Sequence, residues 1–346
     1  MARLDAQFSL SASPARGPLA AASLVMFLTV GVLAGATPRM VGAATPPIDH
    51  VTLAMGYIPN VQFAPFYMAK ARGYYSAAHL DVTFKYGIIT DLLRQVGAGT
   101  YAFANGDSDG VIAARASGIP VRYVAAQYQR FPIVVFSLAE SHITRPADLR
   151  GKTIGVPGPY GSNYIGLLAL LQSAGLGVKD VHVTSIGYTQ VQSVASKKVQ
   201  AAVGFAMNEP VQLRQQGYHV NVLPVGGVAG VMGPGLVSND TLIAKNPDLV
   251  RRFVRASLAG LRATLRDPKG AFSIARTQLP TKLDAAQARY QYAVLTAALP
   301  YWHKAGQRLG YTSLASWASL QKIMHAEGQL AQTVPPTTFF TNSFLP

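Results

Sequence analysis

The sequence predicts an α/β fold in two lobes, with largely parallel sheets. Short apolar segments typical of strands alternate with helical segments from Val51 to Tyr128, and the same alternation starts again at Lys152. Residues 131–136 and 226–235 follow these cycles and have the character of segments that cross between lobes. Two cycles and two crossings indicate two lobes, and a cleft between lobes is the expected place for a ligand.

The first cycle opens with an apolar strand at 51–57. A helix follows at 64–73, and Gly73 marks its end. These units recur at the intervals expected of a doubly wound lobe. The rest of the cycle is predicted as strands at 80–86, 103–104 and 121–128 and helices at 91–98 and 111–117.

The second cycle opens with a buried strand, Lys152–Val156, and a glycine-rich loop that leads into an apolar helix. Gly158 and Gly161 would let the backbone pass close to a ligand, and Ser162 or Asn163 would cap the helix. An ordinary strand–loop–helix connection explains the loop equally well. Around it, the sequence predicts a helical turn at 146–149, further alternation through 180–184, 191–196, 201–205 and 220–224, and mainly helical structure from 247 to 328.

The first 43 residues have the pattern of a cleavable signal peptide. Arg3 and Arg16 precede an apolar run at 17–34, and small residues lead to a cleavage site near Ala43. The run is nearly long enough to span a membrane, so an uncleaved anchor stays open as the alternative. Since the chain has no cysteine, disulfides, thiolate metal sites, a cysteine nucleophile and a lipid-modified N-terminal cysteine are excluded. We expect a periplasmic protein that is not a lipoprotein.

The chain is strongly basic, with a formal net charge of +15. Residues 1–43 hold three arginines and one aspartate, so their removal leaves +13. The basic residues are scattered, and no run of five like charges occurs. We therefore expect no nucleic-acid partner and treat the charge as surface character.

Four stretches of the chain resemble a known family. They are Gly56–Ala69 with Arg72–Tyr75, Gly158–Gly161, Met207–Pro210 and Phe340–Pro346. With them the chain resembles periplasmic solute-binding proteins of the nitrate, sulfonate, taurine and thiamine-pyrimidine type, a group that includes fungal pyrimidine synthases. The resemblance implies a type II periplasmic-binding fold, with two doubly wound lobes around a ligand cleft. Lobe 1 would comprise residues 48–134 and 228–346, and lobe 2 would comprise residues 135–227.

The resemblance places the first candidate ligand-binding residues in lobe 1. Tyr57 matches an aromatic position that stacks on the heterocycle in pyrimidine binders, and the amide of Asn60 would reach a ring edge. Phe63 stands where these binders often carry histidine, which favours a ligand with a larger apolar face. Core packing of Tyr57 and helix capping by Asn60 are the alternatives.

The other candidates come from strand ends, the glycine-rich loop and the C-terminal half. A carboxylate beside an amide suits the edge of an aminopyrimidine or a flavin. A turn, a helix cap and a core position are the competing explanations for Asp107, Glu209 and Trp302. The full set adds Asp107 and Gln127 at strand ends, Tyr160, Gly161, Ser162 and Asn163 from lobe 2, the pair Asn208 and Glu209, and Trp302 at the cleft mouth.

The resemblance also implies a transport role. Such proteins close on a small molecule and deliver it to an ABC permease and its ATPase, without a cofactor; we expect a monomer. A nitrate, alkyl sulfonate or taurine binder needs arginine or lysine aimed at one point, whereas the matched positions carry aromatic, amide and carboxyl groups. We favour a thiamine-pyrimidine precursor or a riboflavin-like ligand and keep the oxyanions as the alternative.

An enzyme of the pyrimidine-synthase kind is the less favoured alternative. The fungal synthases of the family rely on a cysteine-rich motif, and this chain has no cysteine. Its seven histidines form no pair at metal-ligand spacing and no acid–base pair. We therefore expect a carrier with no catalytic residues and no metal.

Overall fold

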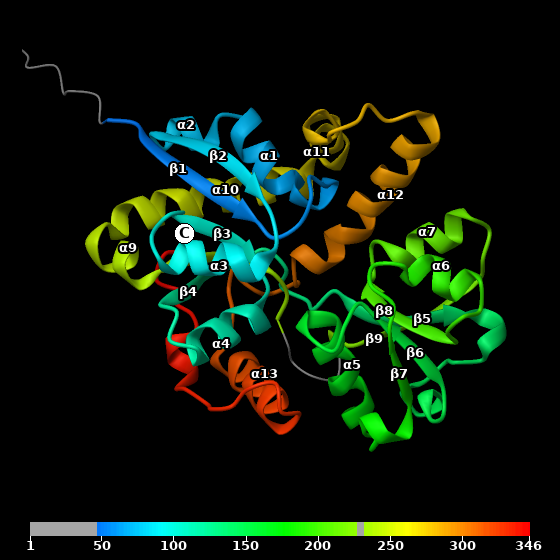
Figure 1. Cartoon of the computed structure of the whole chain (residues 1–346). Helices are drawn as coiled ribbons and strands as arrows, with labels where there is room; N and C mark the ends of the chain where they lie inside the picture. The colour runs from blue at the N-terminus through cyan, green and yellow to red at the C-terminus, as the bar shows by residue number, and fades with distance from the viewer. Residues whose placement is uncertain (1–46, 227–231) are drawn as a thin grey trace, which may run out of the picture. The chain divides into compact units, whose positions relative to one another are not determined.

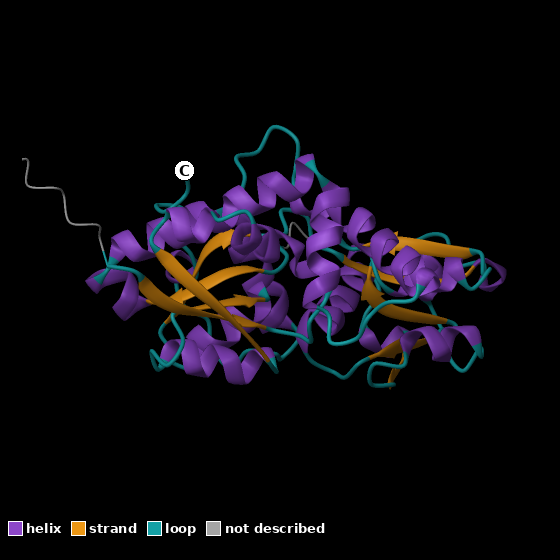
Figure 2. Cartoon of the chain, turned by 90° about the horizontal axis from the view of Figure 1, so that it is seen from above, coloured by secondary structure: helices purple, strands orange, loops and turns teal. Residues whose placement is uncertain are grey.

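Two five-stranded sheets organise the chain (Figure 1). The computed structural model describes residues 47–226 and 232–346. The predicted signal peptide at 1–43, and residues 227–231 of the second predicted crossing, lie outside the described residues. All described residues belong to one unit, Pro46–Pro346. In Figure 2, helices lie on both sides of the strands, as an α/β fold requires.

The first sheet has the strand order β2-β1-β3-β10-β4. Strand β1 pairs in parallel with β2 and β3, whereas β10 is antiparallel to β3 and β4. Its strands are β1 (Asp49–Met55), β2 (Leu80–Tyr86), β3 (Phe103–Gly106), β4 (Val121–Ala126) and β10 (Gly235–Asn239). The helices that connect them are α1 (Ala64–Ala71), α2 (Tyr74–Ala77), α3 (Ile89–Gly97) and α4 (Ser108–Ala116).

The second sheet has the strand order β7-β6-β8-β5-β9. Strand β6 pairs in parallel with β7 and β8, and β5 is antiparallel to β8 and β9. Its strands are β5 (Ile133–Leu138), β6 (Thr153–Val156), β7 (His182–Ser185), β8 (Ala201–Phe205) and β9 (Val220–Pro224). Its helices are α5 (Gly161–Ser173), α6 (Gln190–Ala195) and α7 (Glu209–Gln215).

Helices make up most of the chain after β10. Helix α10 packs against α1, and Gly260 permits the close approach: a Cβ there would overlap the carbonyl oxygen of Pro65 and lie 2.6 Å from the Ala69 Cβ. Phe253 of the same helix stacks on Phe103, with ring centroids 3.8 Å apart. These helices are α9 (Asp240–Lys245), α10 (Pro247–Arg266), α11 (Pro268–Ala275), α12 (Ala285–Trp302) and α13 (Leu314–Ala326).

The predicted α/β class is confirmed, but the sheets are mixed rather than largely parallel. Each sheet contains one strand that runs antiparallel to both of its neighbours, β10 in the first sheet and β5 in the second. Strand β10 was not predicted, because its segment is rich in glycine. Gly235 is needed there, since a Cβ would overlap the ring of Tyr123 on β4. No helix among the described residues is both long and apolar enough to cross a membrane.

Candidate functional site

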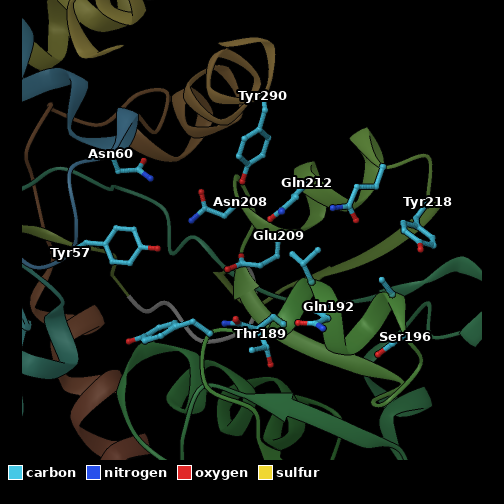
Figure 3. A pocket seen from close by; sticks show the side chains of 15 residues that line it. Tyr57, Asn60, Thr189, Gln192, Ser196, Asn208, Glu209, Gln212, Tyr218 and Tyr290 are labelled. Atoms are coloured by element: carbon cyan, nitrogen blue, oxygen red, sulfur yellow. The ribbon is translucent and has the colours of Figure 1, made fainter. Parts of the chain in front are cut away.

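A pocket of about 710 Å³ gathers polar and aromatic side chains from both sheets' connections and from α12 (Figure 3). Four of the predicted ligand-binding residues line it: Tyr57, Asn60, Asn208 and Glu209. The other residues that line it are Tyr188, Thr189, Gln190, Val191, Gln192, Ala195, Ser196, Gln212, Gln216, Tyr218 and Tyr290.

Tyr57 and Asn60 lie on the loop that follows β1. Tyr57 is 45% exposed, so it projects from the loop instead of packing in the core. The Asn60 Oδ1 accepts a hydrogen bond of 2.9 Å from the Gln62 backbone N–H and caps the short 3-10 helix Val61–Phe63. Asn60 therefore fills both of its expected roles: it fixes the loop and lines the pocket.

Glu209 is the first residue of α7, and its carboxyl lies over the end of β8. The Glu209 Oε2 accepts a hydrogen bond of 2.8 Å from the Phe205 backbone N–H. The missing Cβ of Gly204 leaves room for this arrangement, since a Cβ there would lie 2.7 Å from the Glu209 Cδ. Burial raises the pKa of Glu209 to about 7, although the hydrogen bonds from backbone N–H groups oppose the shift. Near neutral pH this carboxyl can therefore donate or accept a hydrogen bond.

Two tyrosines converge on this carboxyl. In Figure 3 the hydroxyls of Tyr57 and Tyr290 point toward Asn208 and Glu209. Burial raises the pKa of Tyr290 to about 12, with smaller contributions from Glu209 and Tyr57. Burial, Glu209 and Tyr188 also raise the pKa of Tyr57. Tyr57 and Tyr290 therefore remain neutral at physiological pH and offer both aromatic faces and hydroxyls to a ligand.

A network of hydrogen bonds centred on Gln62 holds the segments that carry the pocket residues. The Gln62 Nε2 donates to the Asn208 Oδ1 at 2.9 Å, which joins the loop after β1 to the residue before α7. The Tyr128 hydroxyl donates to the Gln62 Oε1 at 3.2 Å, and the Gln127 Nε2 donates to the Gln62 carbonyl oxygen at 3.0 Å. The buried Gln127 also accepts from the Asn105 amide at 2.8 Å. Gln127 thus holds the loop that carries Tyr57 rather than lining the pocket.

Two predicted site residues, both aromatic, lie in the core. Phe63 is 7% exposed, and its ring packs against Tyr67 and Tyr86. Trp302 is fully buried and meets the Tyr128 ring edge to face, so the core alternative describes it. Neither side chain lines the pocket in this structure.

The glycine-rich loop and Asp107 form a separate polar cluster. Ser162, in the first turn of α5, donates a hydrogen bond to the Asp109 carboxylate on α4. Asp107 caps α4 by position, and burial together with the neighbouring Asp109 raises its pKa. Gly161 adopts a left-handed conformation with φ of 73°. These residues lie outside the pocket lining, and their contact with a ligand stays a prediction.

Two further residues of that loop have different surroundings. Tyr160 is 65% exposed, and its ring covers Gly158 so closely that a Cβ on Gly158 would overlap it. The Asn163 Oδ1 is buried and has no hydrogen-bond partner among the described residues. The loop therefore has the close backbone approach expected from its glycines, but a tyrosine of the same loop occupies the space.

Most of the lining on α6 and α7 was not predicted. Gln192, Ala195 and Ser196 are spaced to share one face at α6, and Gln212 and Gln216 share a face at α7. A glutamine at helical spacing looks like an ordinary solvated face, so only the packing of α6 against α7 reveals the site. Among the described residues that line the pocket, Glu209 is the only one with an ionisable carboxyl, and none is lysine or arginine.

No group of three or more histidine, aspartate or glutamate residues within 47–226 and 232–346 is placed to hold a metal ion. The pocket lining offers one carboxyl, several amides and hydroxyls, and four tyrosines. That donor set suits hydrogen bonding to a neutral polar ligand and stacking on a planar ring.

Comparisons with known proteins bear on both fold and family. Residues 60–271 match the family model described as NMT1/THI5 like. The chain is 43% identical, over 88% of its own length and 88% of the relative, to the riboflavin-binding protein RibY of Chloroflexus aurantiacus. It is 28% identical to the formylaminopyrimidine-binding protein of Halalkalibacterium halodurans, over 66% of this chain and 71% of that one.

The fold has solved counterparts. The periplasmic aliphatic sulphonate binding protein SsuA of Escherichia coli aligns with a TM-score of 0.69 at 15% identity, over 85% of this chain and 97% of that one. Likeness at this level of identity concerns the fold alone. It confirms the predicted periplasmic-binding fold.

Proposed function

The chain belongs to the NMT1/THI5-like family, and from this premise we propose that it is the solute-binding subunit of an ABC importer whose ligand is riboflavin or a close flavin relative. It captures the ligand in the periplasm and delivers it to a membrane permease and its ATPase. The predicted lobes, 48–134 with 228–346 and 135–227, and the monomeric state are part of this proposal.

The composition of the pocket carries the proposal. Three tyrosines, Tyr57, Tyr188 and Tyr290, offer faces for a planar heterocycle, and a fourth, Tyr218, lines the pocket further from Tyr57. Asn208 and Glu209 offer amide and carboxyl groups to the hydrogen-bonding edge of such a ring. The volume of about 710 Å³ lies in the usual range for pockets that hold small organic molecules, roughly 300 to 1,000 Å³. A ligand of flavin size and polarity matches this combination.

The same lining argues against nitrate, alkyl sulfonates and taurine. A compact oxyanion is held by concentrated cationic donors. The described lining contains no lysine or arginine, and Glu209 would repel an anion whenever it is ionised. The relative that is 43% identical is named a riboflavin-binding protein, which favours the heterocycle further.

Ligand capture follows from the arrangement of the lining. Tyr57 and Asn60 come from the loop after β1 of the first sheet, whereas Tyr188 and Glu209 come from connections of the second sheet. A molecule held by both groups stabilises the form in which they approach each other, because its affinity for that form is higher. This differential affinity drives closure, and we infer a carrier rather than a catalyst.

Thermal unfolding of the purified protein with a ligand panel tests the proposal. The panel is riboflavin, 4-amino-5-hydroxymethyl-2-methylpyrimidine, taurine and nitrate, each in excess. A ligand present at 100 times its Kd adds about 2.7 kcal/mol to the free energy of unfolding. We expect a concentration-dependent rise in Tm with riboflavin and none with the anions. A rise with taurine or nitrate alone would overturn the assignment.

A further inference from the structure

The pocket has two chemically different parts. One part, the ring end, is formed by Tyr57, Tyr290, Asn208 and Glu209 with Tyr188. The other part, the amide arm, continues between α6 and α7 and is lined by Gln192, Ala195, Ser196, Gln212, Gln216 and Tyr218. Figure 3 shows the labelled arm residues on the side of Glu209 away from Tyr57. The pocket is therefore extended, with aromatic groups at one end and amides at the other.

The amides of the arm are free to bind a ligand. Gln192, Gln212 and Gln216 make no side-chain hydrogen bond to any other described residue, whereas the Gln62 and Gln127 amides are fully engaged in the support network. Each free amide offers two donors and one acceptor group. Gln192, Ser196 and Gln216 are also exposed, so the arm opens to solvent. A ligand segment in this arm must therefore be polar, and it can be flexible.

A linear polyhydroxyl chain has the matching chemistry. Each hydroxyl donates one hydrogen bond and accepts others, which is what a row of primary amides and hydroxyls can satisfy. A phosphate at the end of such a chain would find no lysine or arginine in the described lining.

We propose that the amide arm is a polyol subsite that binds the ribityl chain of a flavin whose ring system lies at the ring end, and that it favours the unphosphorylated vitamin over its phosphate ester. This inference rests on the proposed function and adds the basis of selectivity. Riboflavin then binds more tightly than lumiflavin, which has the same ring system and no ribityl chain. It also binds more tightly than flavin mononucleotide.

Fluorescence titration with the three flavins tests the subsite. For the unaltered protein we expect the Kd for lumiflavin to exceed that for riboflavin by about tenfold or more, which corresponds to the loss of at least one or two ordinary hydrogen bonds. The double variant Gln192→Ala/Gln212→Ala should weaken riboflavin about tenfold. It should change lumiflavin affinity less than about twofold, and this retained affinity also reports that the variant is folded.

A matched control comes from the same helix. Gln215 is exposed on α7 and does not line the pocket, so Gln215→Ala should leave all three affinities unchanged. Equal affinities for riboflavin and lumiflavin, or equal losses of both in the double variant, would overturn the polyol subsite and leave the flavin-binding function standing. Flavin mononucleotide binding as tightly as riboflavin would overturn the selectivity. Failure of every flavin to bind would overturn the subsite and the proposed function together.

Discussion

Glu209 shows how one buried carboxyl couples the site to pH. Its folded-state pKa is raised from the usual 4.5 to about 7 by burial. The folded protein therefore holds this proton more tightly than the unfolded chain does. The contribution to stability is complete below pH 4.5, is lost as the pH rises toward 7, and changes no further above that.

Glu209→Gln tests this linkage. Glutamine keeps the shape and does not ionise, so between pH 5 and pH 8 the variant should lose less stability than the unaltered protein. The difference should be on the order of 1.4 kcal/mol for each unit of pKa shift that the substitution removes. Urea unfolding at both pH values measures it. The buried Asp107, whose pKa is also raised, contributes in the same direction in both proteins and cancels in the comparison. Identical pH dependence of the two proteins would contradict the assignment.

Some residues of the site could be predicted from the sequence, and others could not. Tyr57, Asn60, Asn208 and Glu209 stood out because they follow strand ends or lie in a family motif, and they line the pocket. Gln62 did not stand out, because its structural role depends on a hydrogen bond to Asn208, which lies 146 positions away in the sequence. Phe63 and Trp302 were predicted for the cleft, but nothing in a sequence says which face of a loop or helix an aromatic side chain will take.

At the scale of elements, the start of α7 depends on the end of β8. Gly204→Ala should displace the Glu209 carboxyl, because the added Cβ would lie 2.7 Å from its Cδ and 3.1 Å from a ring carbon of Phe136. We expect overpacking to cost about 1 to 3 kcal/mol of stability. We also expect weaker riboflavin binding although residue 204 does not line the pocket. Calorimetric titration and urea unfolding measure the two effects. Unchanged riboflavin affinity would show that the position of the carboxyl does not matter.

Gly260→Ala tests a second close contact, which lies between α10 and α1 and outside the pocket lining. Its Cβ would overlap the Pro65 carbonyl oxygen on α1 and lie 2.6 Å from the Ala69 Cβ. The helices must separate, so we expect a loss of about 1 to 3 kcal/mol in urea unfolding. Arg262→Ala, at an exposed position of the same helix, should stay within about 0.5 kcal/mol of the unaltered protein. An unchanged stability of Gly260→Ala would refute the close helix contact.

The elements themselves were largely predictable, since their signals are local. Strands at 80–86, 201–205 and 220–224 have the predicted bounds, and α1 and α5 begin within a few residues of theirs. Strand β10 was hidden because glycine disfavours strands in general, while Gly235 is required here by the ring of Tyr123. The antiparallel insertion of β5 was hidden as well, because strand direction depends on which sheet the chain enters.

In the whole molecule, the pocket depends on contacts that span the chain. The Gln62–Asn208 hydrogen bond and the Ser162–Asp109 hydrogen bond each join a segment of the first sheet's connections to one of the second's. The fold class could be predicted from periodicity alone. The pocket could be predicted only in part, because α6, α7 and the residues that flank them supply most of its lining, and the packing of these helices is a tertiary property.

We propose above all that this pocket binds a flavin. Isothermal titration of the purified protein with riboflavin measures flavin binding directly, with taurine as the sulfonate ligand for comparison. We expect a saturable one-to-one complex with riboflavin, weakened in Glu209→Gln and Gly204→Ala, and no heat of binding with taurine. Saturable binding of taurine with none of riboflavin would contradict it.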